Sequence, residues 1–412
     1  MGATGAAGTP GAVGATGTAG APGGTGPAGP GVTWVDQTGP SVQMVSNVGY
    51  LSDDAAQVAL TLPTNPAIGD LVAVTGVGVG GFKIVQNAGQ QVYAGFENAL
   101  WVPRGALLSW NSVASSADGS HVVASVFSGQ IYTSSDSGTT WTVQNTIVTN
   151  WGPVASSANG AKLMAAEASG LIYLSADYGL TWAPQSPPAG NWIGVASSAD
   201  GTKLFALGSS AVYVSLNAGA TWSLVTPPTA ENWYSIAAST DGSKVIVAGL
   251  GFNPTLRGDI YVSSNSGGNW TLGFTNGSIS QRTVASSADG SKLFAAGSGA
   301  MEKSTDSGAT WAGVIVGEGG LGLAVSADGS TIFNSGASTV SMSMDTGATW
   351  TQLSSTAPPV TKLAVSSDGR HLFGIVNGGY LYNPSATTTL GTAGKLSGTQ
   401  HQSLTLQYVG DG

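Results

Sequence analysis

The sequence lacks cysteine altogether and has few charged residues. With no cysteine among 412 residues, disulfides and thiolate metal sites are excluded. Charged residues make up 8% of the chain, and the 12 lysines and arginines are scattered singly. Binding to nucleic-acid phosphates needs clustered cations, so we expect no nucleic-acid partner. The histidines at 121, 371 and 401 stand apart in the sequence, so we expect neither a metal site nor a cofactor.

Long apolar runs and an export signal are also missing. No hydrophobic stretch approaches the roughly 20 residues that span a bilayer, so we expect no membrane insertion. The first residues, Met1-Gly2-Ala3-Thr4, show neither the basic region nor the apolar core of a signal peptide. In contrast, 63 glycines and 42% hydrophobic residues are typical of turn-rich all-β structure rather than of a disordered chain.

One eight-residue phrase, Ser-x-Asp/Asn-x-Gly-x-Thr/Asn-Trp, recurs through most of the chain. A second phrase, in its commonest form Ser-Ser-Ala-Asp-Gly-Ser-Lys-Leu, precedes each copy. Repeats of about 40 residues, with strand-like segments between turn signals, indicate a β-propeller. The six copies are Ser134–Trp141, Ser175–Trp182, Ser215–Trp222, Ser263–Trp270, Ser304–Trp311 and Ser343–Trp350.

Each repeat contains four short strand patterns, A to D, the number that a propeller blade requires. The seventh repeat has no Trp-bearing strand D, but the orphan segment Leu100–Pro103 precedes the first repeat. We therefore predict an all-β fold with a propeller of seven four-stranded blades, in which Trp101 and its neighbours close the ring and leave no open sheet edge. Six or eight blades are the alternative counts. Strand A begins at or near Trp110, Trp151, Trp192, Trp233, Arg282, Leu321 and Thr361.

The repeated acidic residues are predicted to shape turns. In the eight-residue phrase, the Asp or Asn side chain accepts hydrogen bonds from its own turn, Gly takes a positive φ and Trp packs between blades. Asn fits because an amide caps a turn but cannot act as an acid or base. The Asp-Gly pairs between strands A and B receive the same interpretation. The positions in the phrase are Asp136, Asp177, Asn217, Asn265, Asp306 and Asp345.

The eight-residue phrase resembles the Asp-box, or BNR repeat, of sialidases, sortilin-type receptors, photosystem assembly factors and many bacterial propellers. The sialidase resemblance implies a glycoside hydrolase as one alternative, which would need three arginines, a Tyr nucleophile and a Glu partner. The arginines at 104, 257, 282 and 370 show no such grouping, and no Phe/Tyr-Arg-Ile-Pro motif occurs. We therefore predict no enzymatic activity and no catalytic residue.

Residues 1–31 carry glycine at every third position from Gly2 to Gly31. Only glycine fits at the axis of three polyproline-II chains, so these triplets predict a collagen-like Gly-X-Y stalk. A flexible linker is the alternative. Proline is sparse here, so another part of the protein would have to hold three chains together.

Residues 32–99 show short strand patterns separated by Gly, Pro and Asn turn signals. Leu60–Gln90 and Gly391–Gly412 resemble the two halves of a β-rich domain of phage tail fibres and related collagen-like surface proteins. The resemblance implies a discontinuous trimerisation domain, residues 32–99 and 384–412, with the propeller of residues 100–383 inserted between its halves. The predicted strands are Val42–Val45, Val58–Leu62, Leu71–Val77, Phe82–Gln86 and Gln91–Ala94.

Strand directions sort the connections of the propeller onto two faces. The A–B and C–D turns share one face, here called the turn face, and the B–C and D–A loops share the other, the loop face. On the loop face, blade four has an enlarged B–C loop, Gly249–Gly258. Its Phe252, Asn253 and Arg257 are the candidate ligand-binding residues, because lengthened loops often carry function. A neutral insertion is the alternative.

Together these patterns predict a homotrimeric fibre protein on an extracellular surface appendage or a virion, such as a phage tail fibre. The propeller is predicted to bind a cell-surface glycan or protein receptor, and three copies would add avidity. The competing class is a structural subunit of an extracellular filament without ligand binding. The sequence stops at Gly412, where the related domains run on into one more strand. That strand is missing, supplied by a neighbour or removed.

Overall fold

The computed structural model describes residues 32–66, 70–87, 100–144, 147–185, 190–209, 211–225, 227, 231–251, 258–276, 281–297, 300–314, 320–337, 339–353, 358–385 and 397–407. The predicted collagen-like stalk lies outside these residues. Every regular element in the described ranges is a β-strand. Within these ranges there is no helix long and apolar enough to cross a membrane. The chain forms two compact units, one of Met1–Val92 with Thr388–Gly412 and the other of Tyr93–Thr387.

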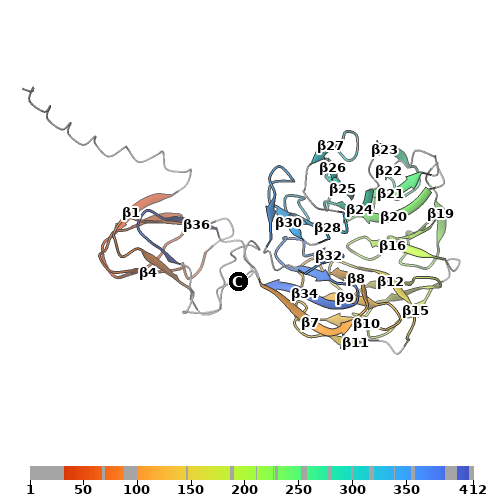
Figure 1. Ribbon diagram of the computed structural model, residues 1–412, viewed down its shortest axis with the longest axis horizontal. Coiled ribbons are helices and arrows are strands. Elements are labelled where there is room, and N and C mark those ends of the chain that lie inside the picture. Colours follow the sequence, from red (N-terminus) through yellow and green to blue (C-terminus); the bar gives the residue numbers. More distant parts are fainter. Residues whose placement is uncertain are drawn as a thin grey trace, which may run out of the picture. The chain divides into compact units, whose positions relative to one another are not determined.

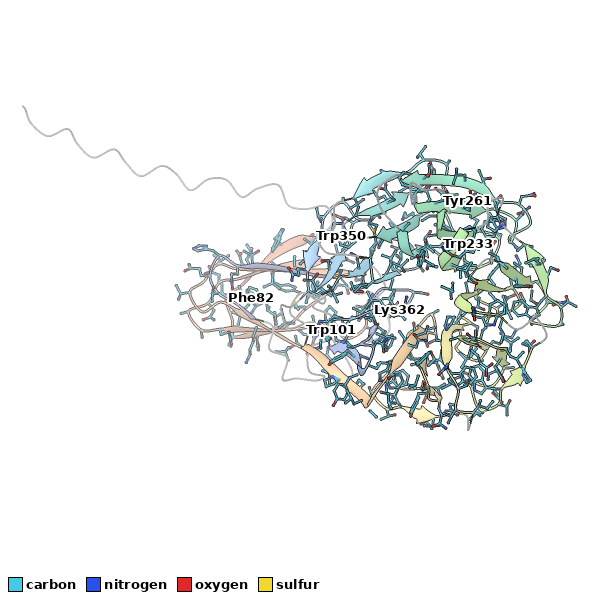
Figure 2. All side chains as sticks on the ribbon, turned by 45° about the vertical axis from the view of Figure 1, so that its right-hand side comes forward. Phe82, Trp101, Trp233, Tyr261, Trp350 and Lys362 are labelled. Atoms are coloured by element: carbon cyan, nitrogen blue, oxygen red, sulfur yellow. The ribbon has the colours of Figure 1, made fainter. Side chains whose placement is uncertain are left out.

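The smaller unit packs two four-stranded sheets around one core that includes Tyr50, Leu60, Val74 and Phe82. Phe82 is labelled in Figure 2. The first six strands alternate between the sheets, and neighbours within each sheet are parallel. The last two strands come from the chain beyond the propeller and add antiparallel. One sheet contains β1 (Thr33–Gln37), β3 (Val48–Ser52), β5 (Leu71–Gly76) and β36 (Ser403–Gln407). The other contains β2 (Ser41–Gln43), β4 (Val58–Thr61), β6 (Phe82–Val85) and β35 (Ser397–Gly398).

The larger unit is a seven-bladed propeller, as the repeats predicted (Figure 1). The inner strands β8, β12, β16, β20, β24, β28 and β32 surround the axis. Each blade is an antiparallel sheet of four strands, which confirms the predicted blade architecture.

Blade one consists of β8 (Trp110–Ser115), β9 (Val122–Val126), β10 (Ile131–Ser134) and β11 (Thr142–Val143). Blade two consists of β12 (Trp151–Ser156), β13 (Leu163–Glu167), β14 (Ile172–Ser175) and β15 (Ala183–Pro184). Blade three consists of β16 (Trp192–Ser197), β17 (Leu204–Gly208), β18 (Val212–Ser215) and β19 (Ser223–Val225). Blade four consists of β20 (Glu231–Ala238), β21 (Val245–Gly251), β22 (Gly258–Ser263) and β23 (Thr271–Asn276). Blade five consists of β24 (Gln281–Ser286), β25 (Leu293–Gly297), β26 (Met301–Ser304) and β27 (Ala312–Val314). Blade six consists of β28 (Gly322–Val325), β29 (Ile332–Ser335), β30 (Val340–Ser343) and β31 (Thr351–Gln352).

Blade seven takes its strands from both ends of the propeller. It consists of β32 (Lys362–Val365), β33 (Leu372–Ile375), β34 (Gly379–Ser385) and β7 (Leu100–Leu108). β7 pairs antiparallel with β34, and Leu100 and Ser385 are register partners. The strand continues to Leu108, five residues beyond the segment considered in the sequence. Trp101 is buried in the core between blades six and seven.

The cores of the propeller lie between neighbouring blades. Strand A of blades one to four carries a Trp at or near its start, and the ring of this Trp packs against a Tyr of strand C in the same blade. Trp110 and Tyr132 make an edge contact at 5.1 Å, and Trp233 and Tyr261 one at 6.0 Å (Figure 2). Since side chains alternate between the two faces of each sheet, the intervening positions pack against the adjacent blade.

A closed ring of backbone hydrogen bonds links all seven blades on the turn face. In each A–B turn, one backbone N–H donates to the carbonyl of the corresponding residue in the next blade, at 2.6–2.8 Å. The last of these bonds runs from Ser367 N to Ala117 O, so the series returns to blade one. The members in order are Ala117, Ala158, Ala199, Thr240, Ala288, Ala327 and Ser367.

Candidate functional site

The eight-residue turns use their own polar side chains. In blade one, the Ser134 hydroxyl donates to Asp136 Oδ1 (2.7 Å) and accepts from Gly138 N (2.9 Å). Asp136 Oδ1 also accepts from Thr140 N at 2.8 Å. The same carboxylate or amide contact to the backbone recurs at Asp177, Asn217, Asn265, Asp306 and Asp345. These side chains therefore fix the turn.

Hydrogen bonds lower the pKa of several turn aspartates. The hydroxyl and amide of Thr310, followed by the Ser304 hydroxyl, lower the pKa of Asp306 to about 2. In the A–B turn of blade three, the Ser198 hydroxyl and then the Thr202 amide lower the pKa of Asp200 to about 2. A carboxylate stabilised in this way is a poor proton donor near neutral pH, because it stays deprotonated.

On the loop face, exposed apolar side chains lie on paired segments of blades seven and one. Phe127 N donates to Ser109 O, two residues after Leu107, and Gly129 pairs with Thr149, next to Val148. Gly379, beside Tyr380, is the register partner of Leu108. We call Leu107, Phe127, Val148 and Tyr380 the apolar arc. Their exposed fractions are 61%, 45%, 67% and 37%. Large exposed apolar side chains gathered on one face are typical of a binding surface.

The start of each inner strand faces the axis near the loop face. In blades one, three, four and five a β-bulge lies near the start of strand A, so one residue stays outside the ladder. In blades three and four this residue is Ile193 and Tyr234, exposed by 38% and 37%. Strands β16 and β20 are neighbours, so these two exposed residues lie on adjacent inner strands. Arg282 holds the same backbone position in blade five.

Lys362 is a cation on the inner strand of blade seven, beside the axial channel that a propeller encloses. Figure 2 shows it towards the centre of the propeller, at the start of β32. Its side chain reaches solvent in the channel, yet the surrounding inner strands desolvate it and lower the pKa of its ammonium group. No described residue forms a hydrogen bond or ion pair with Lys362. The register partners show that the equivalent residues of other blades are small: Ser112, Gly194, Ser235, Thr283 and Gly322.

The small residues at this position pair with the protein itself, unlike Lys362. Ser112 Oγ accepts from Val154 N of the next inner strand at 3.1 Å, and Ser235 Oγ accepts from Val284 N at 3.1 Å. The ammonium group of Lys362 cannot accept a hydrogen bond from a backbone N–H of the next inner strand in this way. Its charge is therefore available to an anion that enters the channel from the loop face.

The candidate ligand-binding residues from the sequence, Phe252, Asn253 and Arg257, lie outside the described residues. The flanking strands β21 and β22 are paired up to Leu250 and Gly258. Sequence reasoning missed the apolar arc and Lys362. The signal for Lys362 was available, because alignment of the seven repeats places a lysine where the other blades have Ser, Thr, Pro or Gly.

The described arginines lie on three different elements of the propeller. Arg104 is on the outer strand of blade seven and Arg282 on the inner strand of blade five. Arg370 is on the turn face, where its Nε lies 3.6 Å from Asp368 Oδ2. Within the described part of the chain, no three His, Asp or Glu side chains gather in a way that would hold a metal ion.

No protein-family model and no curated protein sequence matches this chain. Several solved structures are similar in fold. YCF48 from Cyanidioschyzon merolae has 18% identity and a TM-score of 0.55, covering 70% of this chain and 98% of its own. A structure of YCF48 bound to D1 peptide has 15% identity and a TM-score of 0.55, covering 71% and 97%. Kuenenia stuttgartiensis hydrazine synthase has 15% identity and a TM-score of 0.57, covering 69% and 97%. At these identities the likeness shows the propeller fold alone.

Proposed function

We propose that this chain is a non-enzymatic attachment protein whose propeller binds a protein receptor with its loop face. The observation that carries the proposal is the apolar arc, which shares one face with the mouth of the channel that holds Lys362. The two ends of the propeller, Leu100 and Ser385, pair at the other end of blade seven, on the turn side. The loop face is therefore free of the propeller's own chain ends.

The chemistry of the surface favours a protein occupant that is apolar and carries a carboxylate. Aliphatic and aromatic side chains of the arc match apolar residues of a partner, since such contacts dominate interface cores. The ammonium group of Lys362, which has no partner among the described residues, matches a carboxylate, because a desolvated charge gains most from an opposite charge. The similar propeller of YCF48, solved with a bound D1 peptide, supports a peptide segment as occupant.

The remaining parts of the chain support a carrier role in this proposal. The Gly-X-Y triplets of residues 1–31 and the resemblance of the smaller unit to tail-fibre domains support a homotrimer on an extracellular appendage or virion. Three propellers on one stalk would bind a surface with avidity. The Asp-box interpretation of the turns belongs to the same proposal, as a structural repeat without catalytic duty.

The receptor surface is tested with a random peptide display library panned against the full protein. We expect enriched peptides to combine apolar residues with a carboxylate, and their affinity to fall about tenfold in Phe127→Ser and in Lys362→Thr. Thr283 holds the Lys362 position in blade five, so threonine suits this site. Val143→Ser is the matched control, because Val143 is 44% exposed on the outer strand β11. Peptides that bind both loop-face variants as well as the parent protein would overturn the loop face as the site.

Two further measurements test the rest of the proposal. Native mass determination is expected to give three chains, and a monomer would contradict the trimeric carrier. Turnover of a fluorogenic sialoside would contradict the non-enzymatic assignment. Ordered end-to-end assembly without any selected peptide would favour the filament subunit.

A further inference from the structure

The boundary between blades one and two differs from the other boundaries on the turn face. In blades two to five a lysine follows the A–B turn, and Lys162 and Lys244 reach across to the next blade. Lys162 Nζ donates to Asp200 O (2.7 Å) and Lys244 Nζ to Ser307 Oγ (2.8 Å). The corresponding residue is Thr331 in blade six and a histidine in blades seven and one, His371 and His121. The His121 ring lies against Tyr178 of blade two, with centroids 4.7 Å apart and ring planes tilted by 34°.

Tyr178 is an unusual residue for its backbone conformation. It lies in the eight-residue turn of blade two at φ 61°, where an L-residue with a large side chain is strained. The other five turns place small residues here at similar angles: Ser137, Ala218, Ser266, Ser307 and Thr346. Burial does not compensate for this strain, because the Tyr178 side chain remains 43% exposed. A strained, exposed aromatic residue on an otherwise regular scaffold indicates a functional role.

His121 and Tyr178 line a cleft of about 190 Å³ between the two blades. Ser135, Thr142 and Gln144 also line it, and none of these three side chains hydrogen-bonds to a described residue. The lining includes no lysine, arginine, aspartate or glutamate. The cleft therefore combines an aromatic surface with uncharged donors and acceptors that have no partner within the described part of the chain.

The hydrogen bonds around His121 fix its tautomer. The Ser120 hydroxyl donates to Asp118 Oδ2 at 2.7 Å, so it can only accept at its 2.9 Å contact with His121 Nδ1. Nδ1 of the neutral ring therefore carries the proton, and Nε2 is an acceptor with no partner among the described residues. Gly160 leaves room for the His121 side chain, since a Cβ at position 160 would lie 2.5 Å from His121 Cβ.

We propose that this cleft, which we call the blade one–two cleft, binds one neutral sugar residue. The apolar face of a pyranose ring would stack on Tyr178, and its hydroxyls would pair with Gln144, Thr142 and His121 Nε2. Sugar hydroxyls both donate and accept, which matches this mixed lining. The cleft is smaller than the about 300–1,000 Å³ of pockets for drug-sized ligands, so it suits a single ring. The site is on the turn face and is independent of the receptor surface on the loop face.

The test titrates glucose, galactose, mannose and N-acetylglucosamine into the full protein, with saturation-transfer NMR and calorimetry as readouts. We expect saturable binding of at least one of these sugars, and weaker or no binding of sialic acid. Tyr178→Ser introduces the residue that three other turns carry, and His121→Lys introduces the residue of blades two to five. Each is expected to weaken sugar binding by about tenfold, the equivalent of one aromatic contact.

Controls separate this proposal from a packing role and from the loop-face proposal. Tyr178→Ser should leave the melting temperature unchanged or raise it, because the substitution relieves strain. Peptide binding on the loop face should be unaffected by it, and Tyr380→Ser should leave sugar binding unaffected. No saturable binding of any of the four neutral sugars would overturn the proposal. Binding that survives both cleft variants would overturn it as well.

Discussion

Blade seven and the six other blades reach the same four-stranded sheet by different means. In blades one to six a local eight-residue turn leads into strand D, which is only two residues long in β11, β15 and β31. In blade seven, Pro384 stands where the other blades have the first Ser of the turn, and strand D comes from the opposite end of the propeller. That strand is nine residues long and carries the buried Trp101, whereas Trp350 of blade six is half-buried (Figure 2).

The difference shows which interactions form blades and which close the ring. A local turn holds a short strand D in place because its hydrogen bonds involve residues close in sequence. A strand that arrives from about 280 residues away has no such turn, and closing that long loop costs conformational entropy. A longer ladder and more buried apolar surface offset this cost in blade seven.

Trp101→Ala should therefore have the largest effect. Removal of this ring is expected to lower the free energy of unfolding by about 3–5 kcal/mol, the range for a buried Trp. Trp350→Ala, at the equivalent position of blade six, should cost clearly less because its side chain is only partly buried. Guanidinium unfolding of both variants provides the measurement. Equal losses would remove the distinction between blade seven and the local blades.

Ser134→Ala tests the turn side of the comparison. The variant leaves the buried Gly138 N–H without its acceptor, so we expect a loss of about 1–3 kcal/mol. Pro384→Ala changes the same position in blade seven, where no such contact exists, and should have a much smaller effect. The same unfolding experiment measures both. A larger loss for Pro384→Ala would show that blade seven also depends on local turn structure.

Acid should weaken the carboxylate turns and spare the others. Because the pKa values of Asp200 and Asp306 are lowered from 3.8 to about 2, their stabilisation is present above pH 3.8 and is lost as the pH falls through 2. The melting temperature should fall over this window. Asp306→Asn is the control, since Asn217 and Asn265 form the same turn without charge. In this variant the melting temperature should depend less steeply on pH. An unchanged pH dependence would contradict the role of the Asp306 carboxylate in stabilising the turn.

Lys362→Thr should have the smallest effect on stability. Desolvation lowers the pKa of this lysine in the folded state, so the charged form destabilises the fold below that pKa and the penalty fades as the pH rises through it. We expect a small rise in melting temperature at pH 7 that vanishes above pH 10.5. Thermal melts at both pH values check this. A fall in melting temperature at pH 7 would mean that the ammonium group has a stabilising partner.

Local repeats made the propeller readable from the sequence. Turn signals and the spacing of Trp110, Trp151, Trp192 and Trp233 depend on neighbouring residues, so four strands per blade and seven blades could be predicted. The smaller unit was harder. The sequence patterns missed β1 and β3, because β1 is exposed at most positions and neither strand alternates clearly. The parallel pairing of strands within each sheet had no local signal in the sequence. The predicted strand Gln91–Ala94 lies outside the described residues.

The candidate sites depend on contacts between distant residues. Leu107 and Tyr380 are separated by more than 270 positions, and only the pairing of β7 with β34 brings them to one arc. Phe252 and Arg257 were predicted as ligand-binding residues because their loop is enlarged, whereas the residues of the apolar arc lie in short loops of ordinary length. The exception is Tyr178, since alignment of the six turns already sets a large residue where the others are small.

The ring of seven hydrogen bonds on the turn face has an electrostatic consequence. In an α-helix the peptide dipoles point the same way and add up along the axis. Here each bond passes from one blade to the next in the same rotational sense, from Ala117 around to Ser367 and back. The tangential components of seven such dipoles cancel around the circle. The tangential components therefore give the ring no net dipole across the channel, unlike the charge of a side chain such as Lys362.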